Sequence, residues 1–420
     1  MNGSVNESLN ELPDLPFIGE YEVEIDVPYN QISSDAFINA LSIKLKKKCL
    51  EIKKFLNKNS DCLHLHIEQL RKFASSPGGL ILDEYREKIW PVLAKYYPSD
   101  LEYVKNSDEY ESDSDYDTVS STFNAEYDDE YIEPTIEMLQ LHKDWKQVQL
   151  DVHRTLERFP PFIDEENRTK LMNELTPFIV RILSRNKKFH YYQGFHDVCL
   201  TIVLAVGLDI GYQICKSLTR KGVFSLYLKK TLEESVLKEL ELMFPIFYKK
   251  SKIIDRALKD SNMTCIFALS WPLTWLSHSL HKYQHIVLCF DLFLSSHSLM
   301  PIYLSSALIL SREEEIRVCE NDMGLLYGVL NKIPENCRIP EIIIKAQNLF
   351  DDYPPLVLRK RLMNEYLEDR KAPIPRPKKP ISRNSIFDNL HVLGFVGFGS
   401  ALLLYFVYQY YSSILSGYSI

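Results

Sequence analysis

Residues 190–197, with the sequence HYYQGFHD, place polar and aromatic side chains immediately before an apolar run. Two roles suit such a stretch: a catalytic loop, or the polar start of a buried helix. Gly194 permits a tight backbone path in either case. His196 and Asp197 are of metal-ligating types, but one adjacent pair without further ligands at helical spacing does not make a divalent-cation site. We therefore expect no metal site here.

Several other chemistries find no support in the residues. No GxxxxGK[ST] phosphate loop occurs, and the glycine-rich sequence GFVGFG at 394–399 lies inside a long apolar segment, where a dinucleotide fingerprint has no meaning. The scattered His and Ser residues show no local protease signature. The chain also lacks the dense Lys/Arg stripe of a nucleic-acid groove, so we expect no nucleic-acid partner.

Three short patterns, far apart in the chain, have spacings of interest. Taken alone, Arg154 forms an ordinary ion pair with Asp151, worth under about 1 kcal/mol if exposed, and Gln193 is a polar loop residue. The three patterns are Arg86 four residues before Trp90, Asp151 three before Arg154, and Tyr191 two before Gln193. In this order they resemble the fingerprints R-x-x-x-W, I-x-x-D-x-x-R and Y-x-Q of the TBC family of Rab GTPase-activating proteins.

The resemblance covers about residues 70–330. It includes WPLTWLSHSL and FDLFLSSH, which are similar to the later core helices of the family. Two positions depart from the pattern. Val148 stands where the family often has Ile, and His196 stands where it often has Asn. The second difference changes the local hydrogen bonding, and we expect His196 to be a hydrogen-bonded boundary residue and not a catalyst.

The resemblance implies how the site works. Arg154 neutralises charge on the γ-phosphoryl group of GTP bound to a partner, a contribution worth about 10³ to 10⁵ in rate for related activators. Gln193 holds the attacking water, Asp151 restrains the guanidinium from the same helix face, and Tyr191 aims the loop of Gln193 and Gly194. Arg86 and Trp90 are supporting residues. The GTP and Mg²⁺ arrive with the partner Rab GTPase, so the chain needs no cofactor of its own.

The segments that must position these residues show mainly apolar side chains at helical spacing. Apolar side chains recur at near-helical spacing over residues 33–58, where Ser34 or Asp35 can cap the start. A Pro-Gly-Gly break precedes a second helix with Ile89 and Trp90 as core anchors. Strand alternation with tight hairpin turns is absent. The sequence predicts an all-α fold, a multi-helix domain of TBC type.

Charge is spread unevenly over the 420 residues. The formal net charge is -8, and residues 100–133 contain 13 acidic residues and one Lys. This acidic block has no periodicity, so we expect a disordered insertion over about 99–133. Its Ser, Thr and Tyr residues are candidates for phosphorylation, and a solvated insertion without a function of its own is an equal alternative.

The segment from Leu390 to Tyr411 is a candidate membrane anchor. Its 22 residues carry no formal charge and span about 33 Å as a helix, enough for a bilayer core of about 30 Å. Basic residues precede it and none follows, which places the N-terminal domain in the cytosol. Eight scattered cysteines without a CxxC pair agree with a reducing compartment. The arrangement resembles TBC proteins anchored in the endoplasmic reticulum or early secretory membranes.

The expected organisation follows from these segments. It comprises a polar tail (1–32), the all-α domain (33–350), a Pro-rich and basic linker (351–389), a single-pass anchor (390–411) and a short luminal tail (412–420). Two further classes stay open: a Rab-binding protein without activating function, and a membrane-anchored adaptor or tether whose acidic insertion binds the partner.

Overall fold

A computed structural model of the protein describes residues 29, 32, 35–97, 133–161, 163–319 and 322–371. Every element in these residues is helical, which confirms the all-α class predicted from the sequence. The expected polar tail lies almost wholly outside the described residues. So do the acidic insertion apart from Glu133, the membrane anchor and the luminal tail.

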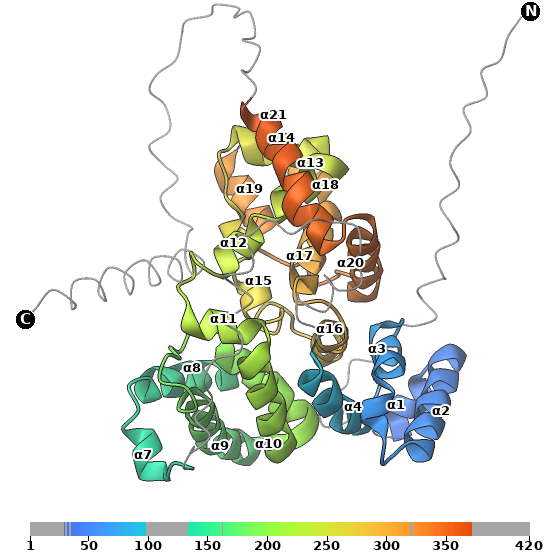
Figure 1. The fold of residues 1–420 in the computed structure, drawn as a ribbon, viewed down its shortest axis with the longest axis vertical. Coiled ribbons are helices and arrows are strands. Elements are labelled where there is room, and N and C mark those ends of the chain that lie inside the picture. Colours follow the sequence, from blue (N-terminus) through green and yellow to red (C-terminus); the bar gives the residue numbers. More distant parts are fainter. Residues whose placement is uncertain are drawn as a thin grey trace, which may run out of the picture. The chain divides into compact units, whose positions relative to one another are not determined.

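The helices follow one another in the order shown in Figure 1. The first part contains α1 (Asp35–Ala40), α2 (Ile43–Lys58), the short η3 (Leu63–Leu65), α3 (Ile67–Ser75), α4 (Asp83–Lys95), α7 (Ile136–Gln140), α8 (Trp145–Arg158), α9 (Glu165–Leu183) and α10 (Phe195–Lys221). The second part contains α11 (Val223–Lys229), α12 (Val236–Leu240), α13 (Met243–Lys250), α14 (Lys252–Asp260), η5 (Cys265–Ala268), α15 (Ser270–Leu273), α16 (Tyr283–Ser295), α17 (Met300–Leu310), α18 (Glu313–Val318), α19 (Met323–Leu330), α20 (Ile339–Asp352), the π-helical η6 (Val357–Leu362) and α21 (Met363–Lys371).

The first amphipathic segment forms two helices, where one was expected. Helix α1 begins at Asp35, and α2 begins after Ser42, whose extended backbone and side chain cap the new helix. The Ser42 hydroxyl accepts from the backbone N–H of Leu45 at 3.3 Å. A serine that satisfies a free N–H in this way favours a new helix start over continuation of the first helix.

Helix α10 contains a sharp break at Gly207. This residue has φ 76° and ψ 176°, values far from a helix and accessible mainly to glycine. Residues Phe195–Arg220 are long and apolar enough to cross a membrane by length and composition, but 67% of an 18-residue apolar stretch within them is buried inside the domain. Because each half on either side of Gly207 is too short to span a bilayer, α10 is best described as two core segments.

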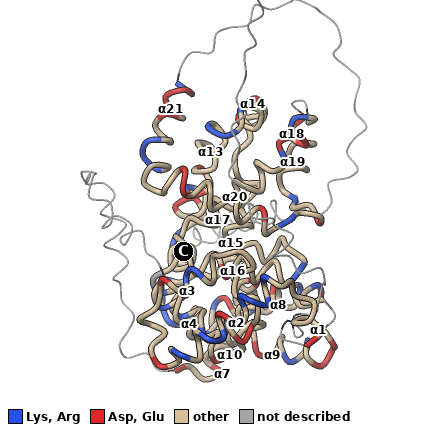
Figure 2. Tube along the Cα trace, turned by 90° about the vertical axis from the view of Figure 1, so that its right-hand side faces the viewer, with Lys and Arg blue, Asp and Glu red and all other residues tan. Residues whose placement is uncertain are grey.

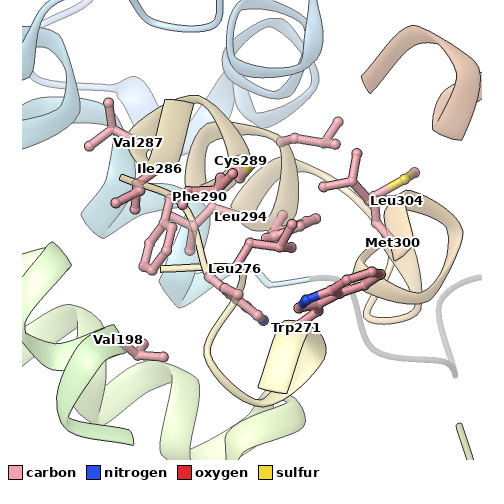
Figure 3. Close-up of a cluster of buried hydrophobic side chains, with 14 of the residues drawn as sticks. Val198, Trp271, Leu276, Ile286, Val287, Cys289, Phe290, Leu294, Met300 and Leu304 are labelled. Carbon is pink, nitrogen blue, oxygen red and sulfur yellow. The ribbon is translucent and has the colours of Figure 1, made fainter. Parts of the chain in front are cut away.

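A dense apolar core lies where α10, α15, α16 and α17 meet. Trp275 and Phe290 are fully buried, and their ring centroids are 5.2 Å apart at 77°, an edge-to-face geometry favourable for aromatic pairs. Figure 3 shows side chains of α10, α15, α16 and α17 meeting in one cluster. Figure 2 shows that α15 and α17 are largely uncharged, whereas α14 and α21 carry residues of both signs. The stretches WPLTWLSHSL and FDLFLSSH, which were expected among the core helices, therefore do contribute to this core.

The helical domain continues beyond the expected boundary at 350. Residues 351–371, assigned to the linker from their composition, form the end of α20, η6 and α21. Leu358 and Leu362 are fully buried, and Arg370 pairs with Asp255 of α14 at 2.5 Å. Charged residues are frequent in this segment, so its composition resembled that of a linker. The two buried leucines nevertheless hold it in the helical domain.

Candidate functional site

Helix α8 presents Arg154 to solvent. Its inner face buries Val148, Val152 and Leu156, and α8 packs on α9, so the helix is held firmly on one side. The Arg154 side chain is 59% exposed, whereas that of Asp151 is 1% exposed. Arg154 Nη1 lies 3.5 Å from Asp151 Oδ1. The guanidinium therefore projects outward while its carboxylate partner stays inside the fold.

Asp151 also links α8 to the loop before α10. Its Oδ2 lies 3.1 Å from the Tyr191 hydroxyl and 3.1 Å from Gln147 Nε2. The backbone N–H of Tyr191 donates to Asp144 Oδ2 at 3.3 Å, just before the start of α8. The predicted residues Asp151, Arg154 and Tyr191 thus lie together, and burial with the adjacent Asp151 charge raises the pKa of Tyr191 well above its usual value.

Gln193 and Gly194 form the turn that leads into α10. Gly194 has φ +112°, in the region that favours glycine, and it precedes the first residue of the helix. Gln193 is half-buried, and its Oε1 is enclosed without a hydrogen-bond partner among the described residues. A buried acceptor without a partner is unusual and points to a group held for a ligand or a water molecule.

We expect Gly194→Ala to disturb this turn. A Cβ at Gly194 would lie 2.7 Å from Cγ2 of Thr274, and the positive φ is strained for alanine. The substitution should lower the free energy of unfolding by about 1–3 kcal/mol, measured by urea denaturation. Gly328→Ala in the exposed helix α19 is the matched control: nothing lies within 4 Å of its Cβ, so it should be neutral or stabilising. Equal effects at the two glycines would contradict the prediction.

His196 joins α8 to the Gln193 turn, a role that the sequence did not reveal. It is hydrogen-bonded, as expected, but it is 3% exposed and so is buried in the fold and not a boundary residue. Its Nδ1 lies 2.7 Å from the Tyr191 hydroxyl and 3.3 Å from the Gly194 backbone nitrogen. Its Nε2 lies 2.9 Å from Oγ1 of Thr155, the residue after Arg154. The adjacent pair His196–Asp197 was the only sequence signal for this network.

Asp197 anchors the other end of the network. It accepts from Thr155 Oγ1 at 3.1 Å and from Arg158 Nη2 at 3.3 Å, and its Oδ2 lies 2.8 Å from Nδ1 of His278. Burial alone raises the pKa of Asp197, but His196, His278 and Arg158 outweigh burial and hold it well below its usual range. Asp197 is therefore a buried carboxylate with several side-chain partners from this chain.

Arg86 and Trp90 form a separate cluster around Asp291 of α16. Arg86 Nε and Nη2 lie 3.1 and 2.9 Å from the two Asp291 oxygens, and Trp90 Nε1 donates to Oδ1 at 2.8 Å. The backbone N–H of Leu80 donates to Oδ2 at 2.9 Å. Asp291 and Asp83 hold the pKa of Arg86 above its ordinary value despite its burial. These residues fasten α4 to α16, apart from the Asp151–Tyr191 cluster.

We expect Asp291→Asn to destabilise the fold strongly. The substitution leaves the fully buried Arg86 guanidinium without its main counter-charge, a loss of about 3 kcal/mol in the free energy of unfolding. Asp352→Asn breaks the pair with Lys250, which is 2.6 Å long and whose carboxylate is 50% exposed, and should cost under about 1 kcal/mol. Urea denaturation of both variants checks the contrast, and a loss at Asp291 no larger than at Asp352 would contradict it.

Comparison with known proteins places these clusters in one recognised domain. The Rab-GTPase-TBC domain family matches residues 83–317. TBC1 domain family member 20 of Homo sapiens is 32% identical over 329 residues, which cover 78% of this chain and 73% of that protein. The GTPase-activating protein gyp10 of Schizosaccharomyces pombe is 26% identical over 207 residues, 48% of this chain and 54% of that protein.

A solved structure agrees on the fold. The crystal structure of the Ypt/Rab-GAP domain of Gyp1p aligns with a TM-score of 0.52, covering 72% of this chain and 98% of that chain at 14% identity. At that identity the likeness shows the fold alone. The family match includes both clusters described above, because Arg86, Arg154, Gln193, His196 and Asp291 all lie within residues 83–317.

Proposed function

The chain belongs to the Rab-GTPase-TBC domain family, and from this premise we propose that it accelerates GTP hydrolysis by a Rab-family GTPase, with Arg154 and Gln193 inserted in trans. One observation supports this most directly. Arg154 supplies an exposed guanidinium, and Gln193 supplies an amide oxygen without a hydrogen-bond partner in the described part of the chain. Asp151 and Tyr191 hold together the two elements that carry these groups. Such a pair offers a cation and a water-positioning group on one rigid support.

Arg154 has the properties that phosphoryl transfer requires. Hydrolysis of GTP spreads negative charge over the γ-phosphoryl oxygens, and a permanent cation with forked donors stabilises that charge. The Arg154 side chain is 59% exposed and is tied by the 3.5 Å contact with Asp151. It can therefore extend into the nucleotide site of a docked partner while the contact limits its freedom to move.

Gln193 supplies the second function. An amide has one carbonyl acceptor and two N–H donors, so it can accept a hydrogen bond from the attacking water and donate one to a phosphate oxygen. Its Oε1 makes no hydrogen bond within the described residues. Because no hydrogen bond to these residues holds the enclosed carbonyl, the side chain can turn toward the nucleotide when the partner docks.

The remaining predicted residues act through these two. Asp151 orients Arg154, and Tyr191 joins Asp151 to the Gln193 turn. Arg86 and Trp90 preserve the fold on which the site is built, through Asp291. The chain needs no cofactor for this chemistry, since GTP and Mg²⁺ are bound by the Rab itself.

A membrane location completes the proposal. The uncharged segment 390–411 lies outside the described residues, and its length supports a single-pass anchor with the helical domain in the cytosol. The long apolar helix α10 is not a candidate anchor, because its side chains form part of the core. We place the chain at the endoplasmic reticulum or an early secretory membrane, on the sequence resemblance described above.

Single-turnover GTP hydrolysis by a panel of purified, GTP-loaded Rab GTPases tests the proposal. The full-length chain should accelerate hydrolysis by at least one Rab by about 10³-fold or more. Nucleotide-dependent Rab binding is measured in parallel. If every Rab in a complete panel hydrolyses GTP at its intrinsic rate while one of them binds, the chain is a Rab-binding adaptor or tether.

A further inference from the structure

His196 contacts both elements that bear the proposed fingers. On one side its Nδ1 approaches the backbone N–H of Gly194, the residue directly after Gln193, at 3.3 Å. On the other side its Nε2 approaches Thr155, the residue directly after Arg154, at 2.9 Å. A single buried ring thus spans the distance between the turn of one finger and the helix of the other.

The donors around the ring determine its tautomer. A backbone N–H can only donate, so Nδ1 must accept from Gly194 and the ring proton must lie on Nε2. The Nε2–H group then donates to Thr155 Oγ1, and the Thr155 hydroxyl donates onward to Asp197 Oδ1 at 3.1 Å. Every proton in this chain of hydrogen bonds has an acceptor when His196 is neutral.

Protonation would rearrange these contacts. Tyr191 has one hydroxyl proton and two possible acceptors, His196 Nδ1 at 2.7 Å and Asp151 Oδ2 at 3.1 Å. With neutral His196 the shorter contact to Nδ1 takes that proton. If Nδ1 became protonated it would donate to the Tyr191 oxygen, the tyrosine proton would turn to Asp151, and the buried Gly194 N–H would lose its acceptor.

We propose that neutral His196 is a positioning residue that holds the Gln193 turn in register with the Arg154 helix, and that its protonation releases the turn and lowers GTPase activation. This inference deepens the proposed function and rests on it for its kinetic part. The hydrogen bonds and tautomer of the ring do not depend on that function. His196 is 3% exposed, so in this proposal it acts through the two fingers and not by contact with the nucleotide.

The groups around His196 determine when it titrates. Asp151 and Arg158 face it from α8, Tyr191 from the loop, Asp197 from α10 and His278 from the segment after α15. Burial is the largest influence and lowers the pKa of His196 below its ordinary value of about 6.5, against the opposing pull of the two carboxylates. The folded state therefore stays neutral where the unfolded chain binds a proton, so stability should fall as the pH drops below about 6.5. Activation should fall only at the lower pH at which the folded ring itself binds a proton.

Hydrolysis rates of His196 variants test the kinetic part. The Rab that the full-length wild-type chain accelerates most is assayed at saturating activator from pH 5.5 to 8.0. His196→Ala should lower the maximal rate about 10- to 100-fold at pH 7.5, while Rab affinity changes little. His196→Asn places Oδ1 near the Nδ1 position, so it should restore most of that loss and should not show the decline at acid pH.

Two controls isolate the effect of the His196 ring. The ratio of wild-type to His196→Asn rates at each pH cancels the pH dependence of the Rab itself. His64→Ala, at an exposed histidine of η3, controls for loss of a histidine elsewhere. An asparagine variant as slow as the alanine variant, or an alanine variant as fast as wild type, overturns the proposal.

Nitrogen NMR of the imidazole rings separates this inference from the proposed function. Full-length protein labelled with ¹⁵N-histidine is compared with His196→Asn to assign the ring. At pH 7.5 we expect a neutral ring with the proton on Nε2 and an unprotonated Nδ1 that accepts hydrogen bonds. A ring protonated on Nδ1, or on both nitrogens, would refute the positioning role even if Rab activation is intact. If the ring has the expected tautomer but the chain accelerates no Rab, the ring geometry is correct and the proposed function is rejected.

Discussion

Arg154→Ala should lower the maximal rate of Rab-bound GTP hydrolysis by about 10³-fold or more, and Arg154→Lys should recover only a small part of the loss. The guanidinium is an exposed cation fixed by the buried Asp151–Tyr191 cluster. Lysine keeps the charge but has neither the forked donors nor the reach to maintain the Asp151 contact. Single-turnover hydrolysis at saturating activator measures the effect on the chemical step apart from binding.

The fold should survive this substitution. Asp151 keeps its contacts with Gln147 and Tyr191 when Arg154 is removed, so thermal unfolding and Rab binding should stay close to wild type. Arg361→Ala, at a 67% exposed arginine of η6 paired loosely with Glu365, is the matched control and should hydrolyse normally. A chain that loses Arg154 yet accelerates the Rab fully would be an activator that uses a different group.

Gln193→Ala should have the second largest effect, a loss of about 10² to 10³ in rate. Removing the amide leaves the attacking water without its acceptor, and no other described amide side chain shares this turn. Gln193→Glu has nearly the same shape but places a negative charge against the γ-phosphate, so it should be no better than alanine. The control is Gln213→Ala, at an exposed position of α10.

The stability of Gln193→Ala separates a catalytic role from a structural one. Because Oε1 makes no hydrogen bond in the described part of the chain, its removal should leave the free energy of unfolding unchanged or slightly raised. A destabilisation above about 2 kcal/mol, with hydrolysis lost in proportion to the unfolded fraction, would indicate that Gln193 supports the turn only.

Local patterns in the sequence were sufficient for the fold class and for much of the element order. The break before α4 and the burial of Ile89 and Trp90 follow from a Pro-Gly-Gly turn and helical periodicity. The new helix start at Ser42 and the kink at Gly207 were missed, because each depends on one residue that helical periodicity does not reveal. Residues 351–371 were assigned to the linker because of their charged composition, but burial of Leu358 and Leu362 holds them in the helical domain.

Spacing within one element predicted the contact between Asp151 and Arg154, and the family resemblance assigned Tyr191 and Gln193 to the same site. Asp151 and Arg154 meet because they are three residues apart on a helix. Asp291 lies 205 residues from Arg86, and nothing in a single sequence marks it as that arginine's partner. The same applies to Thr155 and His196, 41 residues apart. Their roles depend on how α8 meets the turn before α10, which only the folded arrangement determines.

Hydrolysis by a Rab that lacks its own water-positioning glutamine tests the central claim most directly. The Rab most accelerated by the wild-type chain is prepared with that glutamine replaced by alanine and assayed with wild-type activator and with Gln193→Ala. If Gln193 acts in trans, the wild-type chain should still accelerate the altered Rab substantially, and the Gln193→Ala chain should not. Failure of the wild-type chain to accelerate the altered Rab, despite normal binding, would contradict the two-finger mechanism.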